Sequence, residues 1–311
     1  MVTKTRLVKL MGSAFELGVS SECHQDADKY LQAGIAEIQR IEALLSSFLS
    51  DSETSRINRE AFAEGVKVSE ECFELIRRSI HISRLTAGSF DITVGPLKKL
   101  YNFKGKGFAM PSRRRIRETL QCVGFHRIVL DDRTHTVKLT HPKTRIGFEA
   151  IGKGYASDRV KKLWLQSGVT SGFINASGDL NVIGCKANGE PWNIGIADPD
   201  KPDTIKLHLP LRNNAVATSG DYEQFFLYRG KRYSHNINPH TGAPLSEVKS
   251  VTVCSPSAEL SDALATAIGV KGISDGINFV NQLPNTHAII IDSKNHYHFS
   301  KHFSYEEISS Y

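Results

Sequence analysis

Two oxygen-bearing side chains, Asp262 and Thr266, lie four residues apart in a segment that is predicted to be helical. Residues at this spacing leave the same face of a helix, one turn from each other. Ser255 is suited to cap this helix and Pro256 fits a first turn, so the pair is expected on a rigid element. A carboxylate and a hydroxyl suit a hard cation such as Mg²⁺. The alternative is an exposed helix face with two small polar residues.

Two glycine-containing segments precede this helix. Asp91 lies in residues 88–97, where a turn, an apolar stretch and a Gly-Pro break follow one another. An aspartate there is either a turn or capping residue or a catalytic group. In residues 150–158, Gly152 and Gly154 would let backbone amides approach a phosphate ahead of a helix. The spacing of a Walker loop is absent, so phosphate binding stays an open alternative.

Two further polar segments follow. Residues 217–222 combine hydroxyls, a glycine and an aromatic ring, which suits a turn against a polar cofactor and equally an ordinary β-turn. His235 is predicted at the end of a strand, where a histidine is either structural or a general base. The sequence has no Gly-x-Ser-x-Gly elbow and no His-Glu-x-x-His helix, which argues against serine hydrolases and zinc proteases.

Composition narrows the class of protein. The chain has 311 residues, 40% of them hydrophobic, and no apolar run of membrane-spanning length, which predicts a soluble globular protein. Its five cysteines are odd in number and widely spaced, which argues against a disulfide framework and a zinc site. No signal peptide is recognisable, so we expect a cytoplasmic protein, or a periplasmic or membrane-anchored one if the natural N-terminus is longer.

The net charge of +6 raises the question of nucleic-acid binding. The densest basic run, Arg113 to Arg117, lies in a short predicted helix opened by Ser112, and a solvated helix face explains it. No zinc-finger spacing or RNA-binding motif accompanies it, so we expect no nucleic-acid partner. A mildly basic surface would attract an anionic small molecule.

The order of elements indicates the fold. Apolar residues at three- and four-residue steps predict a long amphipathic helix from Asp26 to Phe48, and a second helix is expected from Glu70 to Leu85. Short β-rich runs occur in hairpin-like clusters rather than in alternation with helices. This order predicts an α+β fold with largely antiparallel sheets flanked by helices. The pattern breaks near Thr140 to Arg145, which predicts sub-lobes of 1–140 and 141–311.

Six segments occur together and in order, and the combination resembles the FAD:protein FMN transferases of the ApbE family. The resemblance covers nearly the whole chain and implies one ApbE-like domain over 1–311, two-lobed, with FAD held in the cleft between the lobes. The segments are 45–58, 90–97, 152–156, 218–222, His235 with its Asn-Pro-x-Thr-Gly loop, and 262–266.

The resemblance also implies roles for individual residues. Met11 and Phe48 would stack on the flavin, although core packing is the alternative for both. Asp262 and Thr266 would coordinate Mg²⁺ together with a backbone carbonyl near Gly152. The implied catalytic residues are His235 and Asp91. The implied cofactor-binding residues are Met11, Phe48, Asn58, Lys153, Thr218, Ser219, Gly220, Asp221 and Tyr222.

The implied reaction is phosphoryl transfer. A Thr or Ser hydroxyl of an acceptor flavoprotein, in a Ser/Thr-Gly-Ala-Thr type motif, attacks the FMN-side phosphorus of FAD, and AMP leaves. We hypothesise that His235 accepts the hydroxyl's proton. The alternatives are an FAD pyrophosphatase that gives FMN and AMP, and a non-catalytic FAD-binding protein. The sequence departs from the family pattern at Asn238, where Asp is usual, and at Gly147 and Glu149.

Overall fold

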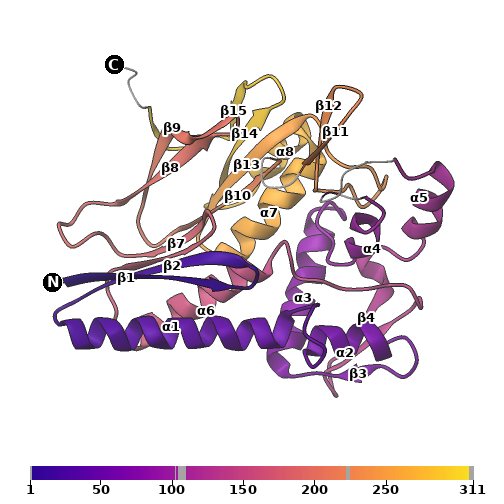
Figure 1. Ribbon diagram of the computed structural model, residues 1–311, viewed down its shortest axis with the longest axis horizontal. Helices are drawn as coiled ribbons and strands as arrows, with labels where there is room; N and C mark the ends of the chain where they lie inside the picture. The colour runs from indigo at the N-terminus through magenta and orange to yellow at the C-terminus, as the bar shows by residue number, and fades with distance from the viewer. Residues whose placement is uncertain (1, 102, 104–109, 222–224, 308–311) are drawn as a thin grey trace.

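An eight-stranded antiparallel sheet forms the centre of the computed structural model, which describes residues 2–101, 103, 110–221 and 225–307. Its strand order is β1-β2-β6-β7-β10-β13-β14-β15 (Figure 1). The strands of the described chain are β1 (Val2–Leu10), β2 (Ser13–Ser21), β3 (Val66–Lys67), β4 (Ile128–Asp131), β5 (Thr136–Leu139), β6 (Gly172–Ala176), β7 (Asp179–Ile183), β8 (Trp192–Asp198), β9 (Lys201–Leu211), β10 (Ala215–Gly220), β11 (Phe225–Tyr228), β12 (Lys231–Ser234), β13 (Val248–Ser255), β14 (His287–Asp292), β15 (Tyr297–Phe299) and β16 (Glu306–Glu307).

Helices cover one face of this sheet. α1, α6 and α7 pack on it, α6 also packs against both α1 and α7, and α8 packs against β14. On the other face, apolar residues of β8 and β9 pack against those of the large sheet. The helices are α1 (His24–Leu45), α2 (Glu53–Glu60), α3 (Glu70–Leu85), α4 (Gly95–Lys98), α5 (Arg113–Leu120), α6 (Gly152–Gln166), α7 (Ala258–Lys271) and α8 (Ile273–Val280).

A smaller region lies beside the large sheet and contains the sheet β3-β5-β4 with α2 and α3 (Figure 1). The α+β class with antiparallel sheets is therefore confirmed. Because β2 pairs with β6, the large sheet joins residues from both sides of the boundary expected near residue 140. No helix in the described ranges has the length and apolar character needed to cross a membrane.

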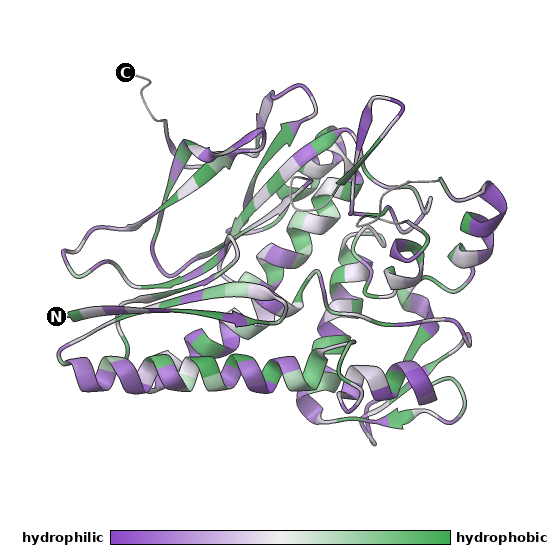
Figure 2. Cartoon of the chain, viewed as in Figure 1, coloured by the Kyte–Doolittle hydropathy of each residue, from purple (hydrophilic) through white to green (hydrophobic). Residues whose placement is uncertain are grey.

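The local sequence signals set the limits of α3, whereas α1 ends earlier than they predict. α3 spans Glu70 to Leu85 as predicted, and the Oγ of Ser69 accepts a hydrogen bond from the amide of Cys72. α1 shows the expected alternation of polar and apolar residues (Figure 2) but ends at Leu45 instead of Phe48. Serine side chains at 46 and 52 bond to nearby backbone groups, which draws the chain away from the helix.

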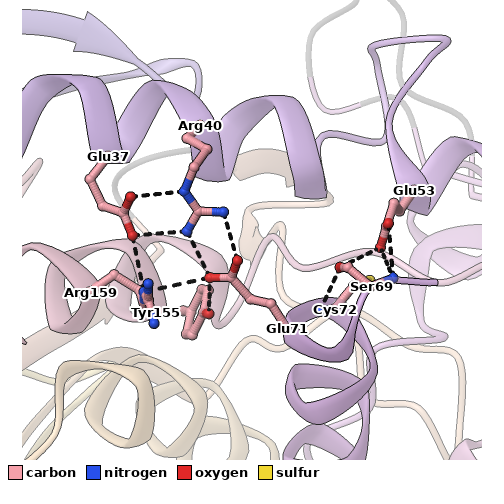
Figure 3. A network of polar contacts seen from close by, with 8 residues as sticks. All are labelled: Glu37, Arg40, Glu53, Ser69, Glu71, Cys72, Tyr155 and Arg159. Atoms are coloured by element: carbon pink, nitrogen blue, oxygen red, sulfur yellow. Dashed lines mark hydrogen bonds and ion pairs between the residues drawn. The ribbon is translucent and has the colours of Figure 1, made fainter. Parts of the chain in front are cut away.

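A polar network ties three helices together beneath the sheet (Figure 3). Arg40 of α1 donates to Glu37 and to Glu71 of α3, at 2.8 and 2.6 Å. From α6, Arg159 donates to Glu37 and the Tyr155 hydroxyl donates to Glu71, at 3.0 and 2.5 Å. The Arg40 guanidinium holds the pKa of Glu71 below its usual value. This network fixes α6, whose first turn borders the candidate site.

Candidate functional site

A small cavity of about 50 Å³ collects six of the residues singled out from the sequence. They come from α6, β10, the loop after β12, and α7. A cavity of this size has room for an ion and its water ligands but not for a nucleotide. The six residues are Lys153, Thr218, Ser219, His235, Asp262 and Thr266.

A second, larger cavity of about 900 Å³ adjoins it. This volume lies within the range of about 300–1,000 Å³ that is typical of ligand pockets. Phe48 and Asn58 line its wall. Lys98 and Glu149 line both cavities, so the two spaces meet where these side chains lie.

Asp262 and Thr266 lie on α7, as the sequence predicts, but the helix starts later than expected. Ser257 is the N-cap, and its Oγ accepts a hydrogen bond from the amide of Leu260 at 3.2 Å. Ser255 is still paired with Ala215 in the sheet, so the cap predicted at Ser255 is wrong and Pro256 precedes the helix.

Asp158 of α6 provides a second cap for α7. Its carboxylate accepts hydrogen bonds from the amides of Ala258 and Glu259, at 3.0 and 2.9 Å, and from the Ser257 hydroxyl at 2.7 Å. A negative charge at a helix N-terminus is favourable. The two helices that carry the candidate metal ligands are thereby locked together.

Gly152 and Gly154 are in the first turn of α6 rather than in a loop ahead of the helix. A Cβ atom on Gly154 would lie 2.2 Å from the carbonyl oxygen of Ala258, so this glycine allows α6 and α7 to approach closely. The amide of Gly154 donates to the Oδ2 of Asp262 at 3.2 Å. The expectation of a glycine loop is therefore corrected to a glycine-mediated helix contact.

Asp179, at the start of β7, is a residue of the small cavity that sequence reasoning missed. It is 4% exposed, its Oδ2 lies 2.6 Å from the Nζ of Lys153, and its Oδ1 accepts from the amide of Thr218. The charge of Lys153 is therefore matched by a buried carboxylate. A single aspartate ahead of a short strand gives no distinct sequence signal. Lys98 and Asn236 also line this cavity without a signal in the sequence, as do Ala150, the first residue of the glycine-containing segment, and Glu149, noted only as a departure from the family pattern.

His235 directly follows β12, where the sequence places it, and its side chain is half-buried. The backbone is held on both sides of it. The amide of Ser234 donates to the carbonyl of Leu245, and the amide of Leu245 donates to the carbonyl of Asn236. The Asn236 side chain also donates to the Oγ of Ser219 at 2.9 Å. His235 is thus presented to the small cavity by a fixed segment.

The side chain of Phe48 is 91% exposed, which excludes the alternative that it packs in the core. Its ring forms part of the larger cavity's wall. Met11 lies in the turn between β1 and β2, and its Cε is 3.5 Å from the position of a Cβ on Gly152. Met11 thus reaches the start of α6 without lining either cavity.

Asn58 lines the larger cavity, but its side chain is bound to the backbone. Its Nδ2 donates to the carbonyl of Ile146 at 2.9 Å, and its Oδ1 accepts from the amide of the same residue at 2.8 Å. Both ends of the side-chain amide are therefore bonded to the backbone of one residue. Asn58 holds the segment that continues to Glu149.

Asp91 lines neither cavity. Its Oδ1 accepts from the amide and hydroxyl of Thr93, at 2.8 and 2.6 Å, and its Oδ2 accepts from the amide of Phe125 at 2.7 Å. Burial raises the pKa of this carboxyl. These bonds favour the turn role over the catalytic one.

The predicted segment 218–222 is divided between two environments. Thr218 and Ser219 line the small cavity, whereas Gly220 ends β10 and Asp221 lies outside both cavities. Burial raises the pKa of Asp221 to about 6, and the Nε of Arg232 is 3.1 Å from its Oδ2. Tyr222 lies outside the described residues.

Gly147 and Glu149, which both depart from the family pattern, are sterically compatible with each other. A Cβ atom on Gly147 would lie 2.4 Å from the Oε2 of Glu149, so the glycine leaves room for this carboxylate. The side chain of Asn238 accepts hydrogen bonds from the amides of His240 and Thr241, at 2.8 and 3.3 Å. Its oxygen closes a turn, a task that an aspartate would perform equally.

Comparison with solved structures defines the class of fold. The chain is similar to the ApbE protein from Thermotoga maritima, with a TM-score of 0.88, 33% identity, and coverage of 96% of this chain and 97% of that one. It is also similar to the apo form of the flavinyl transferase ApbE from Pseudomonas stutzeri, with a TM-score of 0.85, 26% identity, and coverage of 96% and 94%. This is an ApbE-like α+β fold.

The family follows from the sequence comparisons. The model of the ApbE family matches residues 11–291. A protein of Klebsiella pneumoniae named FAD:protein FMN transferase is 31% identical over 284 residues, which are 91% of this chain and 87% of that protein. The chain therefore belongs to the ApbE family and is an enzyme of the transferase class.

Proposed function

We propose that this protein transfers the FMN moiety of FAD to a Thr or Ser hydroxyl of an acceptor flavoprotein, releases AMP, and uses Mg²⁺. The names of its relatives support the reaction. The observation that carries the proposal is the small cavity, where His235 lies with the oxygen ligands Asp262 and Thr266, next to a space large enough for a flavin.

The chemistry of the donors fits a divalent cation. Asp262 supplies a carboxylate and Thr266 a hydroxyl from one face of α7, and the carbonyl near Gly152 is the third implied ligand. Within the described part of the chain no three Asp, Glu, His or Cys side chains form a metal cluster, so the ion would rely on hydroxyl and backbone oxygens besides Asp262. When bound, Mg²⁺ offsets negative charge on the diphosphate.

The placement of FAD follows from the two cavities. The isoalloxazine ring would contact Phe48 in the larger cavity, where an exposed aromatic ring offers a stacking surface. The diphosphate would then extend toward Asp262 and Thr266 in the small cavity. Lys153, paired with Asp179, adds a cationic group whose position is fixed.

In the proposed step, the acceptor's hydroxyl oxygen forms a bond to the FMN-side phosphorus while the bond from that phosphorus to the AMP oxygen breaks. AMP departs with the bridging oxygen, and FMN stays on the acceptor through a phosphoester. His235 accepts the hydroxyl's proton, a role that its half-buried position beside the two oxygen ligands supports. Positioning and charge stabilisation supply the remainder of the rate enhancement.

Incubation of the protein with FAD, Mg²⁺ and a peptide with a Ser/Thr-Gly-Ala-Thr motif tests the proposal. We expect the peptide to gain the mass of one FMN moiety and AMP to appear in equal amount, whereas a peptide with alanine at the attacking residue stays unmodified. Free FMN with unmodified peptide would instead identify an FAD pyrophosphatase. Bound FAD without AMP would identify a non-catalytic FAD-binding protein.

A further inference from the structure

Lys98 occupies the junction between the two cavities. It is the last residue of α4, its side chain is half-buried, and it lines both spaces. Glu149 is on the same junction. A ligand that occupies both cavities, from Phe48 to Asp262, lies next to these two side chains.

The ammonium group of Lys98 makes no direct contact with an acceptor. No hydrogen bond or ion pair joins its Nζ to any residue that the structure describes. Three other cations of the cavity walls do make such contacts. Arg59 donates to the carbonyl of Ser50 at 2.7 Å, Arg145 donates to that of Thr144 at 2.7 Å, and Lys153 is paired with Asp179. A half-buried ammonium that makes no direct ion pair is unfavourable, so an anionic ligand at this position would stabilise it.

We propose that Lys98 is a positioning residue that binds the FMN-side phosphate of FAD. The inference rests on the proposed function, because it takes the ring to lie at Phe48 and the diphosphate at Asp262. The phosphate nearest the ribityl chain then passes the junction, where Lys98 meets it as a flexible point charge. Lys98 also offsets the negative charge of Glu149, which would otherwise repel the diphosphate.

Ligand binding without Mg²⁺ tests this role separately from turnover. The dissociation constants of riboflavin, FMN and FAD are measured for the wild type and for Lys98→Met by the change in flavin fluorescence. We expect the variant to bind FMN and FAD about tenfold more weakly, the effect of losing one charge-assisted contact. Riboflavin, which has no phosphate, should bind equally well to both proteins. Lys98→Arg should recover most of the affinity.

Lys138→Met is the matched control. Lys138 is exposed on β5 and lines neither cavity, so its loss lowers the net charge by the same amount without emptying the junction. We expect less than about twofold change in FMN affinity for this variant. Equal weakening by both variants would show a general charge effect and overturn the proposal.

The double variant Lys98→Met, Glu149→Gln separates phosphate binding from simple neutralisation of Glu149. Recovery of full FMN affinity in the double variant would show that Lys98 acts only on Glu149, which contradicts the proposal; continued weak binding supports it. Failure of this inference can be distinguished from failure of the proposed function. If the wild type does not bind FAD, the proposed function is contradicted. If the wild type transfers FMN and the Lys98→Met variant binds FMN and FAD with unchanged affinity, only the role of Lys98 is contradicted.

Discussion

Gly154 lies against Ala258 so closely that a Cβ on the glycine would be 2.2 Å from the carbonyl oxygen of Ala258. The contact joins the first turns of α6 and α7. The same glycine donates its amide to the Oδ2 of Asp262, so the distance between the helices and the orientation of the proposed metal ligand depend on one residue without a side chain.

We expect Gly154→Ala to destabilise the fold and to weaken Mg²⁺ binding, because the added methyl group forces the two helices apart. The cost of such overpacking is roughly 1–3 kcal/mol, measurable by urea unfolding. Lys162→Ala, an exposed change on the same helix, is the control and should leave stability nearly unchanged. Equal stability of the Gly154→Ala variant and the wild type would show that the contact between α6 and α7 can accommodate a methyl group, which contradicts the prediction.

Replacement of His235 by alanine should lower the rate of FMN transfer by roughly 10²–10⁴-fold, the range for loss of a general base. FAD binding should stay nearly intact, because the histidine acts on the acceptor hydroxyl. The rate is measured as AMP release at saturating FAD and acceptor. His240→Ala is the control, since His240 is exposed in the same loop and lines neither cavity. An unchanged rate in His235→Ala would remove this residue from the mechanism.

Asp262→Asn tests the metal site directly. The asparagine oxygen can still accept from the Gly154 amide, but the charge that attracts the cation is lost. We expect the Mg²⁺ concentration at half-maximal activity to rise by about tenfold or more. Titration with Mn²⁺, followed by electron paramagnetic resonance, measures the same loss without catalysis. Identical metal affinity in variant and wild type would place the ion elsewhere.

Phe48→Ala should weaken FAD binding while leaving the protein stable. The ring is 91% exposed, so its removal exposes little new apolar surface, and we expect a stability change within about 0.5 kcal/mol. Loss of aromatic stacking should cost about 1 kcal/mol of FAD binding, measured by flavin fluorescence. Phe73→Ala provides the contrast, since Phe73 is fully buried and its loss should cost about 3–5 kcal/mol of stability.

The contribution of Asp221 to stability should fall as the pH rises from about 4 to about 6. Burial raises its pKa from 3.8 to about 6 in the folded protein, so within this window the folded state retains a proton that the unfolded chain has lost. Above the folded pKa the contribution is constant. Asp221→Asn removes this contribution and should make the slope of stability against pH more positive by on the order of 1 kcal/mol per pH unit, measured by urea unfolding across the window.

Asp203→Asn, an exposed change on β9, is the control for this pH series. Its slope should match that of the wild type. A wild-type slope in Asp221→Asn would show that this carboxyl does not carry a raised pKa.

The sequence by itself determined the features that depend on neighbours along the chain. Ser69 and the apolar spacing after it set the limits of α3, and the four-residue spacing of Asp262 and Thr266 put both on one face of α7. Two elements gave weaker signals. β2 is buried on both sides over much of its length and lacks alternation, and α2 has only Thr54 and Ile57 buried, so neither shows a clear period.

Only the tertiary structure decided which of these residues meet. Sheet pairing carries β13 through Ser255 and moves the helix cap to Ser257, although both serines are chemically able to cap. The cavity walls come from segments up to about 170 residues apart, from Lys98 to Thr266, whose proximity depends on strand order and helix packing. Asp91 is held in its turn in part by the amide of Phe125, which is distant in the sequence. Local sequence around Asp91 does not predict this contact. Contacts of this kind arise from packing of distant elements, which local patterns do not encode.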